Sequence, residues 1–126
     1  MRTVKLFVAP ALVVALVLGL ASLRADDDSP KLSIKEVMKQ AHGQISLANK
    51  VIAGKGTKED KEKLVELYTA LAANKPTQGD QELWKEKTTA MVDAAKAVEE
   101  GKEGATKDLK KAVDCASCHK VFKPKK

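Results

Sequence analysis

Both cysteines of the chain lie close to its C-terminal end, and a histidine follows them directly, in the segment Cys115-Ala116-Ser117-Cys118-His119. This Cys-x-x-Cys-His pattern is the attachment signature of c-type haem. On one helical turn, two thiols at this spacing can add to the two vinyl groups at one edge of a haem, and the histidine can then bind the iron as an axial ligand. The motif therefore predicts one covalently attached haem c per chain, held by Cys115, Cys118 and His119.

The rest of the chain offers little from which to build a core. After residue 25 there are about 100 residues, enough for one domain, and alanine is abundant among them. The only aromatic residues in this part are Tyr68, Trp84 and Phe122. A chain of this size and composition buries little apolar area by itself, so we expect a covalently held porphyrin to complete the core.

Other roles of a Cys-x-x-Cys pair fit the sequence less well. A thioredoxin-like redox pair follows a strand in a βαβ unit, and no strand pattern is found after residue 25. A structural zinc site needs four ligands, and beyond the motif only His42 is an obvious candidate. A plain disulfide would leave the adjacent histidine without a role.

The N-terminal segment has the pattern of an export signal. Basic residues precede an apolar run over residues 6–20, and a stretch that ends at Ala25 leads into three aspartates. This predicts a signal peptide over residues 1–25; the alternative is an uncleaved anchor, although the run is shorter than the roughly 20 residues that span a bilayer. Haem is attached to c-type apoproteins outside the bacterial cytoplasmic membrane. We therefore expect the domain at residues 26–126 in the periplasm or otherwise exported.

The net charge excludes one class of partner. The whole chain carries a formal charge of +6, but residues 1–25 contribute three basic residues and no acidic one, which leaves +3 on the mature domain. Ionised haem propionates would lower this value further. Such a charge does not resemble a nucleic-acid footprint, and the lysine-rich stretches are expected to be solvated helix faces.

The spacing of apolar residues predicts four amphipathic helices joined by short connections. The first begins at a Ser33–Glu36 capping box and continues to Gly54. Its apolar positions keep one helical face: Ile34, Val37, Met38, Ala41, Ile45, Ala48 and Ile52. The other three are bounded by Thr57 and Asn74, by Asp80 and Gly101, and by Ala105 and Pro124. The expected fold is all-α, an antiparallel four-helix bundle with the cofactor between facing helices near the C-terminus.

With the haem motif at the end of its last helix, the chain resembles the class II c-type cytochromes, the cytochrome c prime family. That family usually carries an aromatic residue three positions after the proximal histidine and a basic residue at the fourth, here Phe122 and Lys123. Its third helix often opens with an acid and a tryptophan, as with Glu82 and Trp84. The resemblance covers residues 31–126, and it implies that Trp84 packs at the haem site.

The resemblance also implies a distal ligand. Early in the first helix, low-spin members carry a methionine over the haem, whereas five-coordinate members carry a non-ligating apolar residue. The segment around Met38 resembles the methionine version, so Met38 is the implied sixth ligand, and a thioether favours Fe(II) and raises the potential. His42 shares this helical face and is the alternative distal ligand; as a further alternative, Met38 is ordinary core. Ile34 replaces the family's usual arginine, which leaves Lys35 or Lys39 to pair with a propionate.

Together these features predict an exported monohaem cytochrome c that carries single electrons between redox partner proteins. An enzyme is not expected, because the cysteines are used by thioether bonds and no other polar residues show catalytic spacing. The alternative is a five-coordinate haem protein that binds nitric oxide or carbon monoxide. We expect no membrane span in the mature chain if the signal is cleaved. Relatives often dimerise through their first two helices, which leaves a homodimer open.

Overall fold

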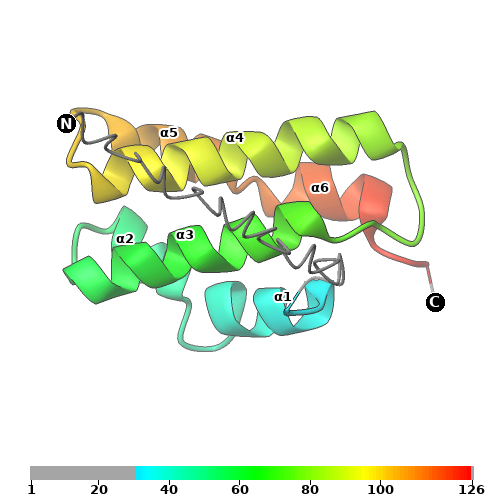
Figure 1. The fold of residues 1–126 in the computed structure, drawn as a ribbon, viewed down its shortest axis with the longest axis horizontal. Helices are drawn as coiled ribbons and strands as arrows, with labels where there is room; N and C mark the ends of the chain where they lie inside the picture. The colour runs from blue at the N-terminus through cyan, green and yellow to red at the C-terminus, as the bar shows by residue number, and fades with distance from the viewer. Residues whose placement is uncertain (1–30, 126) are drawn as a thin grey trace, which may run out of the picture.

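The computed structural model describes residues 31–125, and this part of the chain is all-helical, as predicted (Figure 1). The signal peptide predicted over residues 1–25 lies outside the described residues. Within the described part, no helix combines the length and the apolar character needed to cross a bilayer. The helices are α1 (Ile34–His42), α2 (Leu47–Ile52), α3 (Lys58–Ala73), α4 (Gln81–Glu99), α5 (Ala105–Ala112) and α6 (Cys115–Phe122).

Side-chain caps start the helices where the sequence predicts them. The Ser33 hydroxyl accepts a hydrogen bond from the backbone N–H of Glu36, whose carboxylate accepts one from the N–H of Ser33 in return. Thr57 and Asp60 form the same reciprocal capping box at the start of α3. Asp80 accepts from the N–H at the third position of α4. Each cap satisfies N–H groups that have no partner within the helix.

The prediction of one continuous helix from Ser33 to Gly54 is wrong. The chain leaves the helix at Gly43 and re-enters it after Ser46, so α1 and α2 are separate elements. The Ser46 hydroxyl caps α2 by accepting from the Asn49 N–H and donates to the Ala41 carbonyl oxygen, which gives the break its own hydrogen bonds. Ile45, assigned to the apolar face by its spacing, is 90% exposed in this break.

The last predicted helix is also divided. α5 begins at Ala105 as expected but ends at Ala112, and the haem motif forms a helix of its own, α6. Asp114 lies between them and caps α6, because its carboxylate accepts from the Ser117 N–H at 3.3 Å. The motif therefore starts at a capped helix end of its own.

The core runs between α3 and α4, which pack along each other, with α5 against α4 and α1 against α3 (Figure 1). Tyr68 on α3 and Leu109 on α5 are fully buried at its centre. Trp84 and Phe122 meet edge to face at one end, with ring centroids 5.1 Å apart. In contrast, α1 and α6 do not pack closely against each other, and the candidate site lies between them.

Candidate haem-binding cavity

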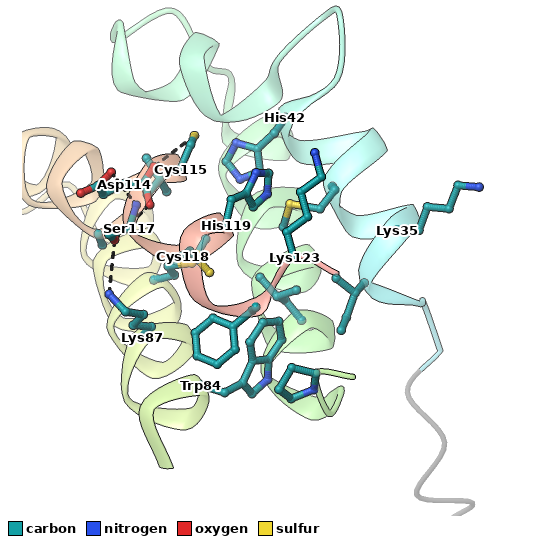
Figure 2. A pocket seen from close by; sticks show the side chains of 18 of the residues that line it. Lys35, His42, Trp84, Lys87, Asp114, Cys115, Ser117, Cys118, His119 and Lys123 are labelled. Atoms are coloured by element: carbon teal, nitrogen blue, oxygen red, sulfur yellow. Dashed lines mark hydrogen bonds between the residues drawn. The ribbon is translucent and has the colours of Figure 1, made fainter. Parts of the chain in front are cut away.

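A cavity of about 600 Å³ lies between α1 and α6, with residues of α3 and α4 forming part of its wall (Figure 2). Its volume is within the range of about 300–1,000 Å³ that is usual for pockets that take small molecules and cofactors. Most of the wall is apolar, and the buried residues Leu71, Trp84 and Met91 belong to it. The cavity therefore has the volume and the mostly apolar surface that a cofactor needs.

α6 brings the whole haem motif to this cavity. Cys115, Cys118 and His119 all line it, because positions three and four apart share one face of a helix. Both thiols are free; Cys115 is exposed and Cys118 is half-buried. Burial raises the pKa of the Cys118 thiol, while the nearby Lys87 ammonium acts in the opposite direction. His119 is exposed, so its imidazole projects into the open part of the cavity.

α1 supplies the opposite wall. Met38 and His42, both predicted as distal ligands, line the cavity across from the motif, and the half-buried Met38 packs against the hydrophobic core. The imidazoles of His42 and His119 both line this cavity (Figure 2). Burial is the main cause that lowers the pKa of His42, and the charge of His119 lowers it further. Both candidate distal ligands therefore line the same space as His119, the predicted proximal ligand.

His42 has a partner that sequence reasoning missed. Its ring stacks on Tyr68 with centroids 5.8 Å apart and an interplanar angle of 17°. The Tyr68 hydroxyl and Nε2 of His42 are 3.2 Å apart and share a hydrogen bond. Burial raises the pKa of Tyr68 well above its ordinary value. A lone tyrosine on an apolar helix face could have indicated this pair, because a buried tyrosine hydroxyl needs a polar partner.

Trp84, which the family resemblance implies at the haem site, lines the cavity near the last turn of α6. Its indole N–H donates to the Asn74 carbonyl oxygen at 2.9 Å, and the ring packs on Phe122. Both aromatic residues line the cavity. The tryptophan is thereby fixed at one end by a hydrogen bond and at the other by ring packing.

Three lysines and one aspartate also line the mostly apolar cavity. Lys35 lies on its wall, whereas Lys39, the other lysine considered from sequence, does not. Lys123 and Lys87 also line it, and the Lys87 ammonium donates to the Ser117 hydroxyl at 3.3 Å. Sequence reasoning missed Lys87; its place three residues after Trp84 on α4 is the signal that could have found it. Ammonium groups at such a wall can pair with carboxylates of a bound molecule.

The residues present fit a haem c. Two thiols and one imidazole occupy one wall, a thioether and a second imidazole occupy the other, and an apolar surface joins them. Ammonium groups are available for the propionates. Among residues 31–125, no three histidine, cysteine, aspartate or glutamate side chains form a group suited to a bare metal ion.

Comparisons with known proteins do not place the chain in a family. No family model, no curated protein and no solved structure matches it.

Proposed function

We propose that this chain is a monohaem c-type cytochrome of the class II kind, which carries one electron at a time between redox partner proteins. The observation that carries this proposal is the position of Cys115, Cys118 and His119 on one wall of an apolar cavity of about 600 Å³, opposite Met38. When bound, a haem supplies reversible one-electron exchange between Fe(III) and Fe(II). Electron transfer of this kind needs no nucleophile or base, and we do not propose an enzyme.

Each residue has a role in this proposal. Cys115 and Cys118 would hold the haem through two thioether bonds, and His119 would bind the iron from the α6 side. Met38 would bind from the α1 side, which matches the low-spin branch of the family that the sequence resembles. Trp84 would pack at the porphyrin edge, and its contact with Phe122 supports that position.

We further propose that the helices form an antiparallel four-helix bundle. α1 with α2 would serve as the first bundle helix and α5 with α6 as the fourth, because each pair is separated by only a short break. α3 and α4 would be the second and third. In this arrangement the cofactor site lies between facing helices, as in other bundles that hold cofactors. The chain would act outside the cytoplasm, after removal of residues 1–25.

An absorption spectrum of the holoprotein and its variants tests the proposal. Met38→Ala should leave covalent haem in place but remove the weak far-red band that a methionine ligand gives in the ferric state. The ferrous variant should become high-spin and bind carbon monoxide, and the reduction potential should fall, because the thioether favours Fe(II). His42→Ala is the matched control on the same helix face and should retain the band.

Two outcomes would contradict this assignment. Loss of the band in His42→Ala but not in Met38→Ala would make His42 the distal ligand. A high-spin spectrum in the wild-type protein would mean an open distal position, and the alternative function, binding of nitric oxide or carbon monoxide, would replace electron transfer. If the exported chain carries no covalent haem, the whole proposal is refuted.

The double variant Cys115→Ala/Cys118→Ala tests the role of the cofactor in folding. Without thioether bonds, the apolar wall of the cavity has nothing to bury against, and a small alanine-rich chain has little other core. We expect this variant to be largely unfolded or molten, since stabilisation by the bound cofactor is lost. Native helicity with a cooperative thermal transition, measured by circular dichroism, would refute the expectation.

A further inference from the structure

One loop contacts the segment just before α1 and the C-terminal end of α6, the two helices on either side of the cavity. This α3–α4 loop, residues 74–79, joins α3 to α4. The Asn74 amide donates to the carbonyl oxygen of Leu32, just before α1, at 2.7 Å, and to that of Ala70 at 2.8 Å. The Gln78 amide donates to the carbonyl oxygens of Val121 at 3.2 Å and Lys123 at 2.6 Å, at the end of α6. The start of α1 and the end of α6 are thus attached to the same short segment.

The loop itself makes close contacts with its neighbours. The indole N–H of Trp84 donates to the Asn74 carbonyl oxygen at 2.9 Å, and Pro76 is buried. Gly79 has φ +91°, and a Cβ at this position would lie 2.7 Å from Cδ1 of Phe122, so only glycine allows the backbone to approach the ring so closely. Asn74 and Gln78 are both half-buried, which reduces competition from water for their hydrogen bonds.

The contact of Gln78 stabilises the part of α6 that carries the proximal histidine. The last carbonyl groups of a helix have no hydrogen-bond donors within the helix, and the Gln78 side-chain amide serves as a donor to them. The Lys123 N–H donates to the carbonyl oxygen of His119 at 3.2 Å, so the capped turn includes His119. Helices as short as α1 and α6 are marginal alone, and contacts of this kind decide where they lie.

We propose that the α3–α4 loop is a clamp that fixes the width of the haem cavity, and that Asn74 and Gln78 are positioning residues for the bond between Met38 and the iron. Asn74 sets the position of the wall that carries Met38, and Gln78 sets the position of the wall that carries His119. Because the thioethers hold the haem to α6, a wider cavity would lengthen the distal bond first. This inference rests on the proposed function, since it requires a bound haem with Met38 as distal ligand.

The test compares holoprotein variants by two readouts besides electron transfer. Gln78→Ala and Asn74→Ala should keep wild-type amounts of covalent haem, because neither touches a thioether. In both, the ferric far-red band should weaken. The ferrous affinity for carbon monoxide should rise by at least about fivefold, the factor that corresponds to loss of one of the two hydrogen bonds that each amide makes. Gln78→Lys restores a nitrogen donor of similar reach and should recover most of the band. Gln81→Ala and Asn49→Ala change exposed residues of the same types and should match the wild type.

Each contrary outcome has a distinct meaning. If Gln78→Ala and Asn74→Ala fold, carry haem and keep the wild-type band and carbon monoxide affinity, the clamp is refuted while the proposed function stands. A wild-type protein with covalent haem but without the band also refutes it. If Gln78→Ala yields no folded holoprotein, Asn74→Ala decides by the same readouts. A wild-type chain without covalent haem overturns the proposed function itself.

Discussion

Replacement of Gly79 by alanine is expected to destabilise the folded protein strongly. The backbone at Gly79 has φ +91°, which an L-residue adopts only at a cost of roughly 1–2 kcal/mol. The new Cβ would also lie 2.7 Å and 2.8 Å from two atoms of the Phe122 ring and 3.2 Å from the Val121 side chain. Phe122 is buried against Trp84, so the ring has little freedom to move away. Overpacking of this kind adds roughly 1–3 kcal/mol.

Gly101→Ala provides the matched control for this prediction. Gly101 has φ +73°, but a Cβ there would have no neighbour within 4 Å. Its cost should therefore be confined to the backbone, about 1–2 kcal/mol, whereas Gly79→Ala should cost about 2–5 kcal/mol in total. Denaturant unfolding of the holoproteins, followed by helicity, gives both values. Equal destabilisation of the two variants would refute the close approach of the loop to Phe122.

Three further predictions concern individual side-chain contacts. Tyr68→Phe keeps the stacked ring but removes the hydrogen bond to His42, and it should lower the unfolding free energy by about 1–2 kcal/mol in thermal or denaturant unfolding. A hydrogen bond from Lys50 is the main cause that lowers the pKa of Asp60. The ionised Asp60 carboxylate therefore stabilises the fold above the ordinary aspartate pKa, and this stabilisation is lost as pH falls through the lowered pKa. Asp60→Asn should destabilise the protein at neutral pH, and the difference in unfolding free energy from wild type should shrink in acid. Ser33→Ala removes the capping box of α1 and should cost about 1 kcal/mol, with faster amide exchange in that first turn.

Much of the fold could be predicted because its determinants are local in sequence. The caps at Ser33, Thr57 and Asp80 each involve residues three positions apart, and all three start helices in the structure. The cap at Ser46, where α2 starts after the break, also joins residues three positions apart, since the Ser46 hydroxyl accepts from the Asn49 N–H. It was not predicted because the spacing of the apolar residues continues through it, and periodicity alone cannot show that Ile45 is exposed.

In the candidate site too, residues fixed by local spacing could be predicted and residues joined by long-range contacts could not. The spacing of the haem motif within one helix brings Cys115, Cys118 and His119 to the cavity, and the chain alone predicts their common face. The contacts of Asn74 and Gln78 with α1 and α6 join residues far apart in sequence, and no local pattern indicates which carbonyl group an amide will reach. Conservation of these two amides in related chains would have indicated such contacts, but a single sequence carries no information about conservation.

The pairing of Tyr68 with His42 bears on the choice between the two candidate distal ligands of the proposed haem. For Nε2 of His42 to bind iron, its hydrogen bond with Tyr68 must break, and the Tyr68 hydroxyl would lose its partner in a fully buried position. An unpartnered buried polar group costs about 1–3 kcal/mol. Met38 would move its thioether toward the iron at the expense of packing contacts alone, and methionine adapts readily to such changes. Both side chains line the cavity, and for ligation through Nε2 of His42 this difference in cost favours Met38. Tyr68→Phe removes that difference, and in this variant ligation by His42 should compete more effectively with ligation by Met38.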